Sequence, residues 1–165
     1  MPASDVAVEE RPVPSASVEP VVNDFSIQVS TVNGSGSQTA NLVLLRAIFQ
    51  MGVPVSGKNM FPSNIAGLPT WFTIRANKDG YIGWKKKTEV LVAMNPETAR
   101  EDTLNLDADS MVVYDESLKL DSVRSDLVFY SVPFDMLVAE VTRDVKMRRR
   151  IRNMIYDGVL SRLLG

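Results

Sequence analysis

Residues 25–51 read FSIQVSTVNGSGSQTANLVLLRAIFQM, and this stretch contains the features that decide the fold. Apolar and polar residues alternate over 25–32, which is the period of a β-strand. Residues 38–51 are almost continuously apolar and predict a helix that is covered on most sides. Between them lies the turn Asn33-Gly34-Ser35-Gly36-Ser37. Such a turn directs backbone N–H groups and the positive end of the helix dipole at one point, which favours an anion.

The turn has only Gly-x-Gly spacing. A full dinucleotide-binding fingerprint would have a third glycine at position 39, where this chain has Thr39. Gly34 and Gly36 allow a sharp turn, and Ser35 and Ser37 can cap a helix or donate to phosphate. From the motif alone two interpretations remain open: a phosphate cradle, or a tight turn that only starts a helix.

Composition restricts the classes of function. The chain has 165 residues, of which 45% are hydrophobic, and this fits one domain. It has no cysteine and no histidine, which excludes disulfides, Ser-His-Asp triads and cluster ligation by this chain. The net charge of −2 argues against general nucleic-acid binding. No run approaches the roughly 20 apolar residues of a membrane span, and the N-terminus does not read as a signal peptide. We therefore expect a cytoplasmic protein without a membrane partner.

Charge is spread unevenly along the chain. Residues 97–126 hold nine acids and three bases, whereas residues 143–152 hold six bases and one acid. This asymmetry suits a protein that docks other surfaces, but each cluster can also be a solvated face.

The order of predicted elements indicates an α/β fold. Residues 1–23 contain several prolines and no aromatic residue, which predicts a flexible N-terminal arm before a domain over 24–165. Gly52 ends the first helix, and 53–55 begin an extended piece, as in the βαβ opening of a doubly wound fold. Further strands are expected at 90–94, 111–114 and 127–130, and helices at 96–104, from Pro133 onward and at 151–164. The prediction is a Rossmann-like, mostly parallel sheet with helices on both faces and an inserted antiparallel hairpin.

Two segments between these elements are candidates for function. Residues 56–69 lack a periodic pattern and mix apolar with amide and hydroxyl side chains, which predicts either an interface or ligand-binding loop or a loop packed on its own domain. Residues 70–76 and 81–84 flank an Asp-Gly turn and predict the hairpin. The aromatic residues of this hairpin and Lys85, Lys86 and Lys87 after it could stack on a nucleotide, or the lysines could protect a sheet edge.

The last helix remains strongly apolar up to Gly165. This pattern indicates either a partner that covers the helix or a chain that continues. We expect the domain to be truncated here or to continue beyond Gly165.

Four segments together carry a resemblance to a known family. They read VNGSGS at 32–37, AIFQMGVPVSGKN at 47–59, FPSNIAGLPTW at 61–71 and VAMNP at 92–96, and a weaker similarity continues through RNMIY at 152–156. They resemble the γ-type domain of 2-oxoacid:ferredoxin oxidoreductases, most closely the 2-oxoglutarate branch, where this domain forms the N-terminal part of the α subunit. The FPSN loop is the specific part of the match.

The resemblance implies an enzyme that uses thiamine diphosphate and Mg²⁺ to decarboxylate a 2-oxoacid, forms an acyl-coenzyme A, and passes electrons through iron–sulfur clusters to ferredoxin. This chain lacks the family's Tyr-Pro-Ile-Thr-Pro and Gly-Asp-Gly motifs and its cluster cysteines. The resemblance therefore implies α-type and β-type catalytic domains elsewhere as partners, and this chain alone is not expected to be catalytic.

Within this chain, the resemblance suggests a share in coenzyme A binding. The candidate binding residues are Asn33, Gly34, Ser35, Gly36, Ser37, Pro62, Ser63, Asn64 and Ile65, with Lys58 and residues 85–87 as second-rank candidates. Two alternatives stay open: a stand-alone Rossmann-type nucleotide-binding protein, and a purely structural assembly domain. The first of these lacks the acidic residue expected about 20 positions after the glycine turn.

Overall fold

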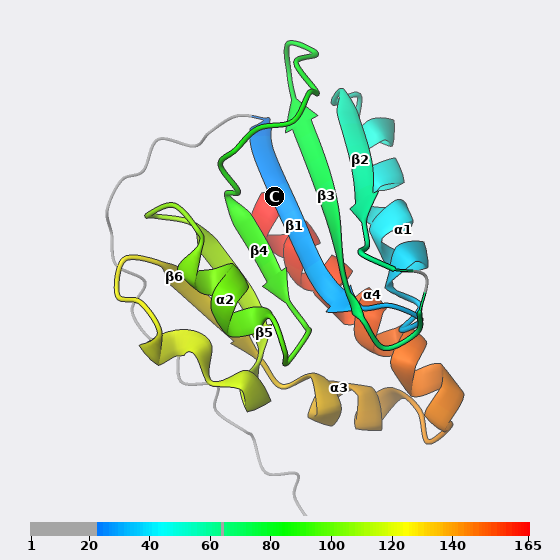
Figure 1. Ribbon diagram of the computed structural model, residues 1–165. Coiled ribbons are helices and arrows are strands. Elements are labelled where there is room, and N and C mark those ends of the chain that lie inside the picture. The colour runs from blue at the N-terminus through cyan, green and yellow to red at the C-terminus, as the bar shows by residue number, and fades with distance from the viewer. Residues whose placement is uncertain (1–22, 64) are drawn as a thin grey trace, which may run out of the picture.

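A computed structural model describes residues 23–63 and 65–165 as an α/β domain built on a six-stranded sheet (Figure 1). The predicted arm over residues 1–23 lies almost wholly outside the described residues, as does Asn64. The strand order is β2-β3-β1-β4-β5-β6. The strands are β1 (Asp24–Val32), β2 (Val55–Met60), β3 (Pro69–Asn77), β4 (Val90–Ala93), β5 (Met111–Asp115) and β6 (Val128–Val132).

Strand directions confirm a mostly parallel sheet. Strands β1, β4, β5 and β6 pair in parallel, whereas β3 is antiparallel to both of its neighbours, β1 and β2. Strand β2 therefore also points in the direction of β1, and β3 alone is reversed. The buried strands β4 and β5 are rich in valine and have no polar alternation, as expected for parallel strands covered on both faces.

Helices cover both faces of the sheet, as predicted. Helices α1 (Ser37–Gln50), α3 (Phe134–Val141) and α4 (Val145–Leu164) pack on one face, around a core that includes Ile27, Val92 and Tyr156. The short helix α2 (Ala99–Leu104) and two 3-10 helices (Glu116–Leu118 and Leu120–Ser122) cover the other face. Figure 1 shows α2 in front of the sheet and α1 and α4 behind it.

Helix α1 is less covered than its sequence predicted. Ala40, Leu44 and Ile48 are buried, but Val43 is 43% exposed and Phe49 is 65% exposed. One face of this helix therefore packs on the sheet, and the other presents apolar side chains at the surface of this chain.

The antiparallel hairpin is present, but the strands expected at 70–76 and 81–84 do not form it. Strand β3 pairs with β2 on one side and β1 on the other, so it has no free edge for a third strand. Residues 81–84 form no strand, and Tyr81 and Trp84 are 76% and 75% exposed. Residues 56–60 of the segment predicted as irregular belong to strand β2, which leaves residues 61–68 as the connecting loop.

Most of the basic run near the C-terminus is helical and belongs to α4. Helix α3 ends at Val141, and Asp144 then caps α4 by accepting hydrogen bonds from the backbone N–H groups of Lys146 (2.7 Å) and Met147 (3.3 Å). The last helix therefore begins at Val145, earlier than the sequence predicted, and contains most of the basic residues of this run. Among the described residues, no helix has the length and apolar character needed to cross a membrane.

The chain leaves β1 and β4 in opposite directions. Helix α1 follows β1 to one face of the sheet, and α2 follows β4 to the other face, although the two strands are parallel neighbours. In open α/β sheets, ligands bind at the carboxyl ends of strands where this reversal occurs. The end of β1 is the position of the glycine turn.

Candidate functional site

Both glycines of the turn after β1 adopt left-handed backbone conformations. The φ angle is 84° at Gly34 and 83° at Gly36, a region in which side chains other than glycine are strained. The N–H group of Ser35 donates to the carbonyl oxygen of Val32 at 3.1 Å. Gly36 is the residue before α1, and no side chain caps the helix there. The two glycines are thus required by the geometry of the turn.

The turn is joined to the loop over 61–68. The backbone N–H of Asn33 donates to the Leu68 carbonyl at 2.8 Å, and the Asn33 carbonyl accepts from the Gly67 N–H at 3.0 Å. The Asn33 side chain donates to the Ile65 carbonyl at 3.0 Å. The structure therefore brings together the two segments in which the sequence predicted a binding site.

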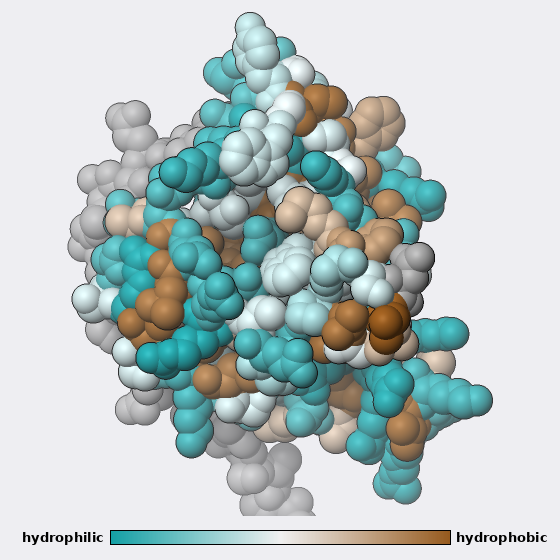
Figure 2. All heavy atoms as spheres, in the orientation of Figure 1, coloured by the Kyte–Doolittle hydropathy of each residue, from teal (hydrophilic) through white to brown (hydrophobic). Residues whose placement is uncertain are grey.

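Not every residue of this loop faces the turn. Pro62 and Ile65 are exposed, and the Ser63 hydroxyl accepts from the Ile65 N–H at 3.2 Å. Figure 2 shows apolar atoms gathered over the connection between β2 and β3, where Met60, Phe61 and Ile65 are 44%, 48% and 65% exposed. This part of the loop presents apolar surface.

Helix α4 holds the glycine turn from the other side. The Asn153 amide donates to the Ser35 carbonyl at 3.0 Å. The Tyr156 hydroxyl donates to the Asn41 amide oxygen at 2.8 Å and lies 3.4 Å from the Ser37 carbonyl. Asn153 is 5% exposed and Tyr156 is fully buried, so these are core contacts of the domain.

A cleft of about 380 Å³ lies between the turn, the loop and α4. Its wall includes Asn33, Gly34 and Ser35 of the turn, and Arg149 and Arg152 of α4. The Ser35 hydroxyl oxygen is buried and has no hydrogen-bond partner among the described residues. A buried hydroxyl of this kind is costly unless something bonds to it, so it suits a site that receives a polar ligand.

The two arginines of the cleft differ in how far their charge is compensated. Arg152 pairs with Asp115 and Asp135, and its guanidinium lies 5.6 Å from the centre of the Phe134 ring. Arg149 is exposed, with no ion pair to any described residue. Arg149 therefore supplies the uncompensated positive charge, which with the turn favours an anionic ligand.

The sequence-based candidates did not include the residues of α4. Their positions lie more than a hundred residues after the turn, and the basic run at 143–152 was interpreted as a docking surface or a solvated face. The run of basic residues followed by Asn153 was the available signal, but its placement beside the turn depends on tertiary structure.

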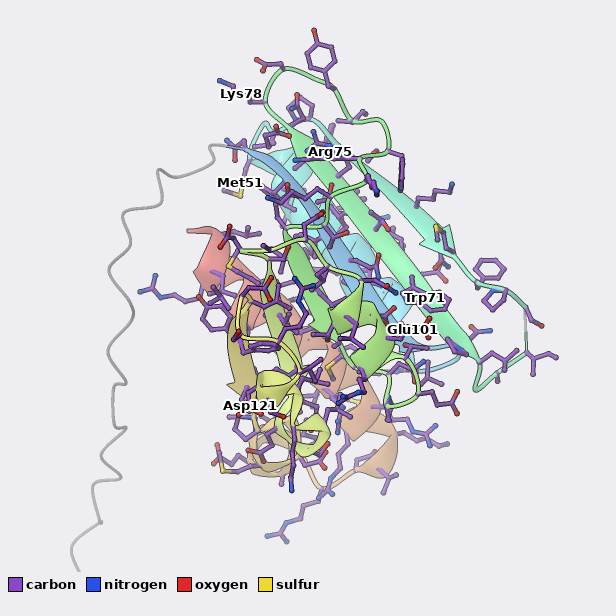
Figure 3. All side chains as sticks on the ribbon, turned by 60° about the vertical axis from the view of Figure 1, so that its left-hand side comes forward. Met51, Trp71, Arg75, Lys78, Glu101 and Asp121 are labelled. Atoms are coloured by element: carbon purple, nitrogen blue, oxygen red, sulfur yellow. The ribbon has the colours of Figure 1, made fainter. Side chains whose placement is uncertain are left out.

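The lysine candidates lie away from this cleft. Lys58 is exposed on the edge strand β2 and is not part of the cleft wall. Lys85 pairs with Glu89 at 2.6 Å and lies 4.0 Å from Asp24, the first residue of β1. Because the turn follows the last residue of β1, Lys85 sits at the opposite end of the sheet. Figure 3 shows Lys78, from the same loop, at the tip of a projection beyond Arg75 on β3.

Lys86 borders a separate cavity on the α2 face of the sheet. The Trp71 indole N–H there donates to the Asp102 carboxylate at 3.0 Å, and the Ser30 hydroxyl donates to the same carboxylate at 2.6 Å. Trp71 lies beside α2, on which Figure 3 labels Glu101. These hydrogen bonds satisfy Asp102 within the domain. They explain the Trp71 and Asp102 side chains in the wall of this cavity as parts of the fold.

Burial perturbs two titratable groups on α4. Asp157 is 8% exposed, neither of its carboxylate oxygens has a partner among the described residues, and burial raises its pKa to about 7. Burial also raises the pKa of Tyr156, and the neighbouring Asp157 charge raises it further. The Tyr156 hydroxyl therefore stays protonated and acts as a hydrogen-bond donor.

The described residues contain no cluster of three or more histidine, cysteine, aspartate or glutamate side chains that could hold a metal ion. With no cysteine in the sequence, this chain offers no ligand set for an iron–sulfur cluster.

A family model described as pyruvate ferredoxin/flavodoxin oxidoreductase matches residues 26–165. The chain belongs to this family. The match begins in β1 and includes the glycine turn, the loop and α4, so the cleft lies entirely within the oxidoreductase domain. No curated protein sequence matches this chain.

Solved structures of such oxidoreductases share the fold. A 2-oxoglutarate:ferredoxin oxidoreductase from Magnetococcus marinus, solved with 2-oxoglutarate, coenzyme A and succinyl-CoA bound, is similar with a TM-score of 0.67 and 19% identity. The similarity covers 77% of this chain but only 23% of the Magnetococcus chain.

Two separate subunits are also similar. The gamma subunit of a keto/oxoacid ferredoxin oxidoreductase from Geobacter sulfurreducens has a TM-score of 0.63 at 14% identity, over 82% of this chain and 75% of that one. The pyruvate oxidoreductase subunit PORC from Thermotoga maritima has a TM-score of 0.53 at 13% identity, over 82% of this chain and 95% of that one. At these low identities, the TM-scores show a shared fold.

Proposed function

We propose that this chain is the γ-type part of a cytoplasmic 2-oxoacid:ferredoxin oxidoreductase and contributes coenzyme A binding and assembly to the complete enzyme. Membership of the family and the likeness to a gamma subunit support this assignment. The oxidised substrate would be 2-oxoglutarate, as in the Magnetococcus enzyme, and the product succinyl-CoA.

The observation that carries the coenzyme A assignment is the convergence of Arg149 and the glycine turn on one cleft, whose wall includes Ser35 with its buried, unpartnered hydroxyl. Coenzyme A is a polyanion, and its phosphate groups need cationic side chains and hydrogen-bond donors. Arg149 supplies charge, and Ser35 supplies a donor. The cleft volume lies within the range of ligand sites in proteins.

Thiamine diphosphate, Mg²⁺ and the iron–sulfur cluster would belong to partner chains or domains. The described residues of this chain offer no metal-binding cluster. In this proposal the α-type and β-type catalytic parts carry the decarboxylation and the transfer of electrons to ferredoxin. The cleft described here would hold coenzyme A beside them.

The experiment is a kinetic comparison of Arg149→Ala with the unaltered chain, each co-expressed with the other subunits of the enzyme. Coenzyme A-dependent electron transfer from 2-oxoglutarate to ferredoxin is measured. We expect the KM for coenzyme A to rise about tenfold, which corresponds to one lost charge-assisted hydrogen bond. The KM for 2-oxoglutarate should not change.

Arg162→Ala serves as the matched control, because Arg162 is exposed in the last turn of the same helix and lies outside the cleft. An unchanged KM for coenzyme A in Arg149→Ala would contradict the proposed site. Tight binding of NAD by the isolated chain in calorimetry would instead favour a stand-alone nucleotide-binding protein.

A further inference from the structure

Strand β6 is an edge of the sheet, and its outer side has no strand partner among the described residues (Figure 1). Its sequence, Val-Phe-Tyr-Ser-Val, contains no charged residue and no proline, and Val128 is 46% exposed. The other edge strand, β2, does carry a charge, Lys58. Natural proteins usually protect a sheet edge with charges, proline or a bulge, because an unprotected edge pairs with other chains. Strand β6 therefore has the properties of a strand with which another chain pairs.

The backbone of β6 offers hydrogen-bonding groups on its outer side at Phe129 and Ser131. The N–H of Val128 donates to the Ser110 carbonyl at 3.0 Å, which directs the polar groups of Val128 toward β5. In a parallel ladder, alternate residues of a strand direct their N–H and C=O groups to the same neighbour, so those of Tyr130 also point toward β5. The groups of Phe129 and Ser131 point the other way, where an extended chain laid beside β6 would meet them.

A groove of about 700 Å³ lies along this edge and has walls on both faces of the sheet. Tyr130 and Val159 line it on the face covered by α4, and Phe129 lines it on the face covered by the 3-10 helices. Phe129 makes an edge-to-face contact there with Tyr114, with 6.0 Å between the ring centres. Successive side chains of an added strand would point to opposite faces, so the groove offers a wall to each set. We call it the edge groove.

The two walls of the edge groove differ in polarity. The wall beside α4 is apolar and includes Val132 and Val159. The other wall carries Glu116, Lys119 and Asp121, which are exposed and form no ion pair with any described residue. The acids outnumber the base, so this wall is net negative. An extended segment that is apolar on one face and basic on the other would complement both walls.

A second copy of this chain fits the edge groove less well. Pairing of two β6 strands about a two-fold axis would bring the 3-10 helices of both copies to the same face of the joined sheet. Glu116 and Asp121 of each copy would then lie on that face, where like charges oppose pairing. The strand also has only five residues, which is a short contact for a stable dimer.

We propose that the edge groove binds an extended segment of a catalytic partner, which adds to the sheet as a strand beside β6. The segment would present apolar side chains toward Val159 and a basic side chain toward Glu116 and Asp121. Its backbone would bond to the outward groups of Phe129 and Ser131. This inference rests on the proposed function, since it assigns one contact between this chain and the rest of the enzyme.

Ser131→Pro is the main test, with the variant mixed with the other subunits of the enzyme. Proline removes the outward N–H of this residue, and an edge strand tolerates it because that N–H does not bond to β5. Assembly, measured by sedimentation, should weaken about tenfold or more through the lost backbone pairing. Ser131→Ala is the matched control, because it keeps the N–H and should assemble normally.

Charge reversal tests the chemistry of the partner segment without changing the backbone of β6. The double variant Glu116→Lys, Asp121→Lys should weaken assembly about three- to tenfold, because two exposed acids no longer attract a basic side chain. Asp79→Lys is the control, because Asp79 is an exposed acid in the loop after β3 and lies outside the edge groove.

Hydrogen–deuterium exchange reports the pairing in the unaltered protein. In the chain alone, the amide hydrogens of Phe129 and Ser131 should exchange faster than those of Tyr130 and Val132, which point toward β5. In the assembled enzyme, the outward amides should lose this fast exchange. If Ser131→Pro lowers the thermal midpoint of the chain alone, exchange and charge reversal decide the question.

Each possible failure has its own meaning. If the outward amides stay in fast exchange in the assembled enzyme and Ser131→Pro assembles like Ser131→Ala, the edge groove is no assembly contact, and the proposed function stands. If charge reversal leaves assembly unchanged or strengthens it, the partner segment is not basic and the proposal is wrong. A dimer of the chain alone that Ser131→Pro dissociates would make a second copy the occupant. If the unaltered chain does not assemble with the other subunits, the proposed function fails together with the inference.

Discussion

The Asn153 amide nitrogen donates to the Ser35 carbonyl oxygen at 3.0 Å and thereby joins two residues that are 118 positions apart. This hydrogen bond links α4 to the glycine turn at the edge of the cleft. Two left-handed glycines give the turn a shape that its own sequence permits but does not enforce. Contacts from α4 therefore define the position of the donors around the proposed ligand.

Replacing Asn153 with alanine tests this role. We expect Asn153→Ala to lower the free energy of unfolding by about 1–2 kcal/mol, because the Ser35 carbonyl loses a buried partner. In the assembled enzyme the KM for coenzyme A should rise while kcat changes little. Urea denaturation and steady-state kinetics measure the two effects. A loss of stability with an unchanged KM would mean that Asn153 has no part in ligand binding.

Gly57 lies where a side chain has no room. A Cβ atom at this position would lie 2.3 Å from Leu45 Cδ1 and 2.8 Å from Phe72 Cζ, so β2 approaches α1 closely here. Gly57→Ala should destabilise the domain by about 1–3 kcal/mol through overpacking. Gly83→Ala is the control, because a Cβ there would meet nothing within 4 Å. Equal thermal midpoints for the two variants would contradict the close packing of β2 on α1.

Asp157 should make stability depend on pH. Burial raises its folded-state pKa from the ordinary 3.8 to about 7. Because the folded state favours the protonated acid, the contribution of Asp157 is fully present below about pH 4 and is lost as the pH rises through 7. An asparagine at this position cannot ionise, so Asp157→Asn should be more stable than the unaltered protein at pH 8, on the order of 2 kcal/mol.

At pH 4 the same substitution should change stability much less, because Asp157 is then protonated in the folded state and only partly ionised in the unfolded state. Chemical denaturation at both pH values gives the comparison. A stability difference that is the same at pH 4 and pH 8 would show that Asp157 does not titrate in this range.

Phe61 and Ile65 form apolar surface on the loop next to the cleft, with 48% and 65% exposure. If this loop contacts a catalytic partner, replacing both residues with serine should weaken assembly about tenfold or more. The thermal stability of the chain alone should not fall, because neither side chain is buried in it. Leu104→Ser, at an exposed site on α2, is the control. Sedimentation of the mixed subunits measures assembly, and unimpaired assembly would exclude this loop as the contact.

The local pattern predicted the unit β1–turn–α1 almost to the residue. Alternation over 25–32 and the apolar run after the turn reflect contacts that this unit makes with the rest of the core. The buried strands β4 and β5 were equally clear, because uninterrupted valine-rich runs are typical of parallel strands.

The extended piece predicted at 53–55 marks the start of β2, but its continuation to Met60 escaped prediction, because this strand lies at the sheet edge and its second half is exposed, so its sequence has no hydrophobic period. The aromatic residues at 81–84 suggested a strand, but β3 already has partners on both sides. For the site, the sequence provided the turn and the loop. It did not provide Arg149 and Asn153, because their positions depend on how α4 packs against the rest of the domain.

The hydrogen bond from α4 to the turn also has a consequence for biosynthesis. Ser35 leaves the ribosome long before Asn153 is translated, so a nascent chain can complete β1 and α1 while its binding cleft still lacks one wall. The cleft appears only when the last helix packs against the sheet. Coenzyme A would then recognise only chains whose translation and folding have reached α4, and ligand binding would stabilise the finished domain without affecting its unfinished precursors.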